Sequence, residues 1–325
     1  MIAMHTRRDF ISLSALAGLA SILGCDTETA RQLIAVLPEP GPGFPQSMGS
    51  VSRDEMEAPL KVISGYLPPD IIGHTFTIGS VPRDEQGPQL IGDGIVYRLD
   101  FGGAQANLKS AIVKTDCYLL DEATLDDPEL CFKDNGFIRF STAFGVRNFA
   151  NTAFQPIQDG RLLVTYDAGR PWEIDPETLE VITPIGLLSS WAPFFAALSP
   201  GLNFFSLSMT SAHPAYDAVS GTTYTVNFVP PVDGLNADLF TRVMWWDGES
   251  EPQSCSIVDS DGQPVVIRMA CHQINITDNL IVLIDTAFQL EAESIFGGEM
   301  VTRPAIPETA MWLVRKADLV AGGQA

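Results

Sequence analysis

The sequence predicts an all-β protein, and three observations support this prediction. Its 27 glycines and 23 prolines are scattered among valine, isoleucine, threonine and phenylalanine, a composition that favours short strands and turns over long helices. Strand-like segments recur without regular helices between them, which indicates a sandwich, a barrel or a propeller. The 325 residues exceed the usual size of a lone sandwich, so a β-propeller is favoured.

The first 25 residues are predicted to be an export signal. Arg7 and Arg8 precede a short apolar run, as in signals of the twin-arginine type. The run is too short to span a bilayer. It ends at residues 22–25, which resemble a lipobox in which Cys25 would carry the lipid. We therefore expect an exported protein, periplasmic or at the cell surface, anchored to the membrane through Cys25.

Residues 26–58 are rich in proline and glycine and are predicted to form a tether or an extended arm. The folded domain is expected over residues 59–325. Lysine and arginine number 19 against 40 aspartates and glutamates, which gives a net charge of −21. A surface this acidic repels phosphate backbones, so nucleic acid is excluded as a partner.

The expected strands are short runs of apolar and β-branched residues bounded by turn residues. Residues 217–221 and 259–262 carry the aspartate and glycine typical of hairpin turns. Residues 189–198 are mostly apolar, and a short helix, an apolar wall or an ordinary packed loop are all open there. Strands are expected at residues 95–101, 111–120, 161–166, 171–175, 222–228, 241–246, 264–269 and 279–286.

Four cysteines remain besides Cys25, and an oxidising compartment would permit two disulfides. The pairs close in sequence are Cys117 with Cys131 and Cys255 with Cys271, although the connectivity is open. No Cys-x-x-Cys spacing occurs, so a zinc ribbon has no support.

Three histidines lie outside the signal: His74, His213 and His272. His213 stands in the segment Thr-Ser-Ala-His-Pro-Ala-Tyr-Asp, and His272 in Cys-His-Gln-Ile-Asn-Ile-Thr-Asp-Asn. Imidazole nitrogens suit iron, and a ring nitrogen binds a metal best when the proton on the other nitrogen is held by a carboxylate or carbonyl. Asp167, at the end of an expected strand, could hold that proton.

Both histidine segments resemble the carotenoid oxygenase superfamily, which includes carotenoid cleavage dioxygenases, lignostilbene dioxygenases and retinoid isomerases. Residues 63–73, 92–96 and 172–180 resemble three further motifs of that family, the last through its Asp-Pro-x-Thr-Leu-Glu pattern. The resemblance spans roughly residues 58–320 and implies a seven-bladed β-propeller.

The resemblance also implies a site. His213 and His272 match the first two of four histidines that hold a non-haem Fe(II) ion in the family. Asp167 falls where the family keeps a glutamate that hydrogen-bonds a ligand histidine, and His74 falls where the family has no ligand. No histidine follows His272. We therefore expect a partial propeller over residues 59–325, from an incomplete or split member of the family.

The implied reaction is Fe(II)-dependent cleavage of a conjugated carbon-carbon double bond by O2, in an apolar substrate similar to a carotenoid or a stilbene. The alternative is a catalytically inactive propeller lipoprotein that binds an apolar ligand or a partner protein. A hydrolase has little support, because no Gly-x-Ser-x-Gly elbow occurs. Four aromatic residues are candidates for an apolar substrate path, or for plain packing: Trp191, Phe194, Phe204 and Phe205.

Overall fold

The computed structural model describes residues 52–83, 91–135, 138–194, 204–231, 239–268, 270–286 and 308–325. All of them belong to one compact unit, Val51–Ala325. The predicted export signal with Cys25 and most of the 26–58 tether lie outside the described residues, so they stay predictions. Within the described part of the chain, no helix is long and apolar enough to cross a membrane.

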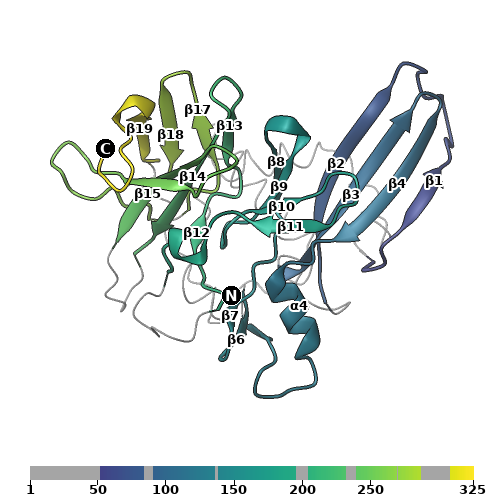
Figure 1. Cartoon of the computed structure of the whole chain (residues 1–325), viewed down its shortest axis with the longest axis horizontal. Coiled ribbons are helices and arrows are strands. Elements are labelled where there is room, and N and C mark those ends of the chain that lie inside the picture. The colour runs from purple at the N-terminus through teal and green to yellow at the C-terminus, as the bar shows by residue number, and fades with distance from the viewer. Residues whose placement is uncertain are drawn as a thin grey trace, which may run out of the picture. The chain divides into compact units, whose positions relative to one another are not determined.

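Antiparallel sheets make up the described fold, which confirms the all-β class (Figure 1). Each sheet is built mainly from neighbours in sequence, as expected for strands joined by short turns. The first sheet has the order β1 (Glu57–Leu60), β4 (Gln105–Ile112), β3 (Asp93–Gly102), β2 (Ile72–Val81). The second has the order β5 (Lys133–Asn135), β6 (Ile138–Ser141), β7 (Gly145–Val146).

The remaining sheets contain the segments that carry the predicted site. The third has the order β11 (Val181–Pro184), β10 (Trp172–Ile174), β9 (Leu162–Thr165), β8 (Ala153–Pro156). The fourth has the order β12 (Met209–Thr210), β14 (Thr222–Val229), β15 (Phe240–Trp246), β16 (Gln253–Ser256), with β13 (Ala215–Asp217) also paired to β14. The fifth has the order β17 (Ile274–Ile276), β18 (Leu280–Ile284), β19 (Met311–Arg315).

Two of the predicted strands are wrong. Residues 111–120 end strand β4 and then form the helix α4 (Asp116–Ala123), because the Thr115 hydroxyl caps the helix by accepting a bond from the Tyr118 amide at 3.3 Å. Residues 264–268 form no strand, since Pro264 has no amide hydrogen to pair, and only an isolated bridge joins it to Val258.

Short 3-10 turns complete the secondary structure of the described residues, and one of them falls in the segment for which a helix, a wall or a loop was open. In the 189–198 segment the structure has a single 3-10 turn, η3 (Leu188–Ser190), and residues 195–198 lie outside the described part. Two more 3-10 turns are η2 (Gln158–Gly160) and η4 (Lys316–Asp318).

Both predicted hairpin turns are confirmed. The Asp217 carboxylate accepts the Val219 amide at 3.0 Å, and Gly221 has a φ of +67°, so the turn joins β13 to β14. The Asp259 carboxylate accepts the Asp261 amide at 2.9 Å and closes the second turn. The Lys316 ammonium reaches Asp217 at 2.6 Å and lowers the pKa of that carboxyl to about 2.

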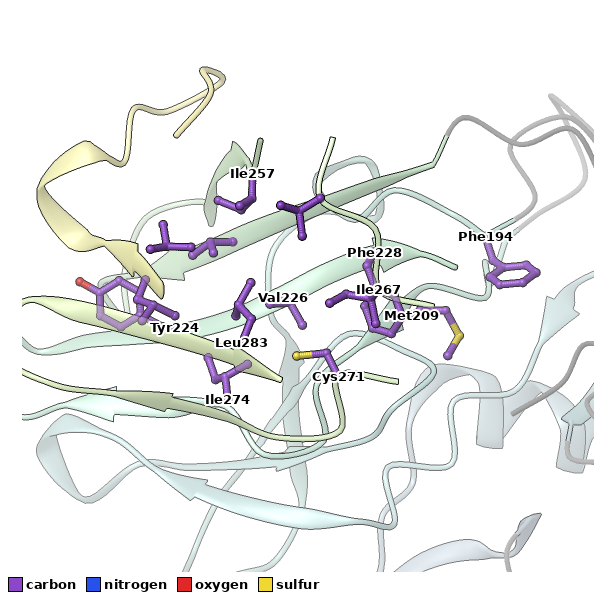
Figure 2. Close-up of a cluster of buried hydrophobic side chains, with 14 of the residues drawn as sticks. Phe194, Met209, Tyr224, Val226, Phe228, Ile257, Ile267, Cys271, Ile274 and Leu283 are labelled. Atoms are coloured by element: carbon purple, nitrogen blue, oxygen red, sulfur yellow. The ribbon is translucent and has the colours of Figure 1, made fainter. Parts of the chain in front are cut away.

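A buried apolar cluster supports the sheets that carry the two predicted histidine ligands. Its side chains come mostly from β12, β14, β17 and β18 and from the segments between strands, with one residue each from β6, β7, β15 and β19. Figure 2 shows Cys271, which is fully buried, with its sulfur among these side chains. All four described cysteines are free thiols, so neither of the sequence-near disulfides is formed. The labelled members of the cluster are Phe194, Met209, Tyr224, Val226, Phe228, Ile257, Ile267, Cys271, Ile274 and Leu283.

A network of buried charges ties helix α4 to the strands around it. Asp121 on the helix is fully buried and accepts bonds from Arg139 Nε at 2.6 Å and from Arg147. Arg147 also bonds Asp93, whose other oxygen meets Arg53 at 2.9 Å. Burying a charge is costly unless the charge is paired. In this network each charged side chain contacts a side chain of opposite charge.

The start of strand β3 requires glycine at position 94, where another segment of main chain comes close. The Gly94 amide donates to Phe149 O at 2.9 Å, and a Cβ at position 94 would collide with the Ala150 carbonyl oxygen. Gly94→Ala is therefore expected to lower the free energy of unfolding by roughly 1 to 3 kcal/mol, the range for overpacking a buried site. Urea denaturation measures the free energy of unfolding of the variant. The control is Gly79→Ala on β2, where a Cβ would meet no atom closer than 3.8 Å, and an equal loss in both variants would contradict the account.

Candidate metal centre

The two predicted ligand histidines lie side by side, although 59 residues separate them in the chain (272 − 213). Their ring centroids are 4.8 Å apart and the ring planes make an angle of 77°. An isolated parallel bridge brings them together: the His213 amide donates to His272 O at 3.1 Å, and the Ile274 amide donates to His213 O at 3.3 Å.

The local sequence explains why both rings point away from the core. Ala212 and Cys271 are fully buried, and in an extended chain the next side chain points to the opposite face. Pro214 keeps His213 extended, because a residue before proline is disfavoured in the helical region. Small buried neighbours and one proline thus place two imidazoles on a common surface.

The third predicted residue, Asp167, joins this pair. It lies two residues after the end of strand β9, and its Oδ1 lies 2.7 Å from Nδ1 of His272. The Asp167 side chain is 16% exposed and that of His272 is 36% exposed, so solutes can reach the ring. With Nδ1 donating to the carboxylate, the neutral ring carries its lone pair on Nε2, the state that a metal requires.

The pKa values of the two imidazoles are shifted in opposite directions. The hydrogen bond to Asp167 raises the pKa of His272, because the carboxylate favours the charged ring. Burial lowers the pKa of His213, and the neighbouring His272 lowers it further. His213 is therefore kept in the neutral form that can ligate a metal.

This donor set fits part of an iron site. Two imidazoles, one neutral through burial and one held by a carboxylate, are ligands suited to Fe(II). Among the described residues, however, no group of three or more His, Cys, Asp and Glu side chains is arranged to hold a metal. The pair would supply two nitrogen ligands, and the rest of the coordination shell would come from water or from groups outside these residues.

The four aromatic residues predicted as candidates for a substrate path have different surroundings. Trp191 and Phe194 are buried in different apolar clusters, and Trp191 Nε1 donates to Ile185 O at 2.9 Å. Phe204 is 67% exposed and packs edge-on against Phe144, while Phe205 bridges to Gly145.

His74 belongs to a different sheet from the segments that carry the other two histidines. It lies on strand β2, and its Nδ1 is 2.6 Å from Asp100 on the paired strand β3.

Sequence reasoning missed three buried hydroxyls that surround the histidines. Thr165 donates to Ala212 O, Thr210 lies 2.7 Å from Tyr166 O and 2.9 Å from Gly169 O, and Ser211 contacts both histidine carbonyls. Thr210 and Ser211 directly precede Ala212 and His213, and this adjacency was the available signal. Apart from the contact of Ser211 with His213 O, these partners lie 41 to 61 residues away in the chain, which no local pattern reveals.

Metal affinity at this site is expected to fall on acidification, because protons compete for the imidazoles. Asp167 raises the pKa of His272, so the loss begins above the ordinary histidine value of about 6.5. In Asp167→Asn the onset moves to lower pH, and affinity at pH 7.5 drops about 10-fold to 100-fold, as for other partners of ligand histidines. Co(II) titration at several pH values measures both effects. Asp167→Glu keeps the carboxylate and serves as the control, and an unchanged pH profile in Asp167→Asn would contradict the assignment.

Comparisons with known proteins agree on one family. The family model described as retinal pigment epithelial membrane protein matches residues 49–318. Carotenoid cleavage dioxygenase 7, chloroplastic, from Oryza sativa subsp. japonica is 28% identical over 152 residues, which are 42% of this chain and 24% of that protein.

Solved structures show the same fold. The Pseudomonas brassicacearum lignostilbene dioxygenase superposes with a TM-score of 0.59 at 20% identity, over 89% of this chain and 56% of its own. The Glu150Gln mutant of the Synechocystis apocarotenoid oxygenase gives a TM-score of 0.55 at 19% identity, over 82% of this chain and 55% of its own. The chain thus spans a little over half the length of these structures, and the expected carotenoid oxygenase type of β-fold is confirmed.

Proposed function

Since the chain belongs to the retinal pigment epithelial membrane protein family, the carotenoid oxygenases, we propose that it holds Fe(II) through His213 and His272 for oxidative cleavage of a conjugated double bond. The observation that carries this proposal is the paired imidazoles 4.8 Å apart, one of them bonded to Asp167. The proposed substrate is apolar, similar to a carotenoid or a stilbene.

Each of the three residues has a separate task in this proposal. His213 and His272 offer neutral ring nitrogens, and Asp167 holds the Nδ1 proton of His272 so that the ring neither rotates nor changes tautomer. When bound, the iron supplies the site at which O2 is activated, and the net reaction places one oxygen atom on each carbon of the broken double bond. No proton is consumed, so the site needs no general acid.

The proposal is tested with iron-loaded protein, O2 and two probe substrates, a hydroxystilbene and an apocarotenal. We expect aldehyde products and matching O2 uptake, both lost in His213→Ala, while His74→Ala stays active because His74 bonds Asp100 on another sheet. Iron bound at one per chain with no product from either probe would contradict the proposed activity.

A second candidate function is a catalytically inactive lipoprotein that binds an apolar ligand or a partner protein. It is favoured by one observation, that no three metal-ligating side chains converge among the described residues. Retention of the apocarotenal by the protein without turnover, unchanged in His213→Ala, would support this candidate over the first.

We further propose that the protein is exported and anchored in the membrane through a lipid on Cys25. The part of the predicted tether, residues 26–58, that precedes Arg53 would link Cys25 to the fold, since Arg53 pairs with Asp93 and β1 begins at Glu57. Support comes from the paired arginines, the short apolar run and the cysteine that ends it. Labelled fatty acid should enter the wild-type protein and not Cys25→Ser, and equal labelling of both would contradict the anchor.

A further inference from the structure

The two histidine segments are joined by few main-chain hydrogen bonds, so the side chains that also link them matter for the position of the rings. Only two main-chain hydrogen bonds form the bridge, from the His213 amide to His272 O and from the Ile274 amide to His213 O. A single bridge of this kind restrains the spacing of the two segments less than a full ladder does. The position of one ring relative to the other therefore depends on what else holds these carbonyls.

Ser211 provides that additional link. Its Oγ lies 3.1 Å from His213 O and 3.0 Å from His272 O, and the residue is 1% exposed. The hydroxyl has one proton, which it donates to either carbonyl or shares between them. Ser211 is thus in hydrogen-bonding contact with the main chain of both histidines.

The same strand end also bonds the main chain of the segment that carries Asp167. The Thr210 amide donates to Asp167 O at 2.7 Å, and the Thr210 hydroxyl lies 2.7 Å from Tyr166 O. Thr210 and Ser211 are adjacent, so the aspartate segment and both histidine segments are bonded to two consecutive residues. The three segments thus meet at Thr210 and Ser211, Thr210 bonding the aspartate segment and Ser211 bonding the two histidine segments.

We propose that Ser211 is a positioning residue for the histidine pair: its buried hydroxyl sets the separation of the two imidazoles and keeps His272 aligned with Asp167. This inference rests on the proposed iron site for its purpose, whereas the geometry that it describes exists without metal. Ser211 would act on the candidate metal centre through the main-chain carbonyls of the two histidines.

The test compares Ser211→Ala with a matched control, Ser141→Ala. Ser141 is also 1% exposed, and its hydroxyl donates to a main-chain carbonyl, Leu130 O, at 2.8 Å. The Ser141 hydroxyl also accepts the Ala143 amide at 3.2 Å, so each variant loses one buried hydroxyl with two polar contacts and is expected to lose similar stability. Only Ser211→Ala is expected to alter the histidine pair.

The first readout uses metal-free protein labelled with nitrogen-15 in its 4 histidines, so that NMR resolves each ring. In the wild type and in Ser141→Ala we expect His272 as a single tautomer with its proton on Nδ1. In Ser211→Ala we expect a mixture of tautomers and at least about 5-fold faster exchange of that proton. Unchanged His272 ring signals in folded Ser211→Ala would overturn the proposal.

The second readout is the affinity for Co(II) as a metal probe. Ser211→Ala is expected to bind Co(II) about 10-fold more weakly than Ser141→Ala, the lower end of the range for partners of ligand histidines. If Ser211→Ala shows the mixture of His272 tautomers and the wild type binds no Co(II), the iron proposal fails and the role of Ser211 stands. If both variants bind Co(II) like the wild type, the role of Ser211 fails and the iron proposal stands.

A second variant covers the case in which Ser211→Ala does not fold. Ser211→Thr keeps the hydroxyl and adds one methyl group. Folded Ser211→Thr is expected to keep the His272 ring signals of the wild type, and a mixture of tautomers there would count against the hydroxyl as the positioning group.

Discussion

His272→Ala is expected to weaken Co(II) and Fe(II) binding by more than roughly 100-fold, beyond the range seen when only a partner of a ligand is removed. The variant removes one of two imidazoles and also leaves Asp167 without the ring that it orients. Its effect on folding is expected to be small, because the ring is 36% exposed. Titration of metal-free protein with Co(II), followed by its absorption spectrum, measures the change.

The matched control for this experiment is His74→Ala. His74 is exposed and bonds a carboxylate, Asp100, just as His272 bonds Asp167, so the two substitutions remove the same kind of contact. Metal affinity should be unchanged in His74→Ala. If both variants lost affinity equally, the metal would be bound elsewhere on this acidic surface.

Arg147→Met is expected to lower the free energy of unfolding by roughly 3 to 5 kcal/mol, the usual effect of leaving a buried charge without its partner. The Arg147 side chain is 1% exposed and bonds both Asp93 and Asp121, which are themselves buried. Its guanidinium also lies over the ring of Tyr118, 5.3 Å from the centroid. Urea denaturation measures the loss.

Arg315→Met provides the comparison, because Arg315 pairs with Asp318 on the surface, where their side chains are 74% and 49% exposed. An exposed pair of this kind contributes about 0 to 1 kcal/mol. Equal losses in the two variants would mean that the charges around Arg147 are solvated in solution and that α4 is held by other contacts.

Much of the fold could be predicted from local sequence. The runs that became β3, β9, β10, β14, β15 and β18 alternate or cluster apolar residues between turn signals, and Asp217 and Asp259 each cap the turn expected of them. The prediction failed where one residue overrode the pattern. Thr115 caps a helix inside an apolar run, and Pro264 removes an amide that a strand would need.

The sequence predicted the site residues that stand in local motifs, and it missed those whose role depends on contacts between distant segments. His213, His272 and Asp167 each stand in a recognisable local motif, and the structure brings them together. The hydroxyls of Thr210 and Ser211 and the charges of Asp121 and Arg147 stand in no such motif. Their importance lies in contacts between segments far apart in the chain, which depend on tertiary packing.

X-ray absorption at the iron edge of the Fe(II)-loaded protein tests the central claim most directly, because it reports which atoms surround the metal. We predict the scattering signature of two imidazole rings in the wild type, lost when His213 and His272 are both replaced by alanine. Iron surrounded by oxygen atoms alone, or the same imidazole signature in the double variant, would contradict the assignment of these two histidines as ligands.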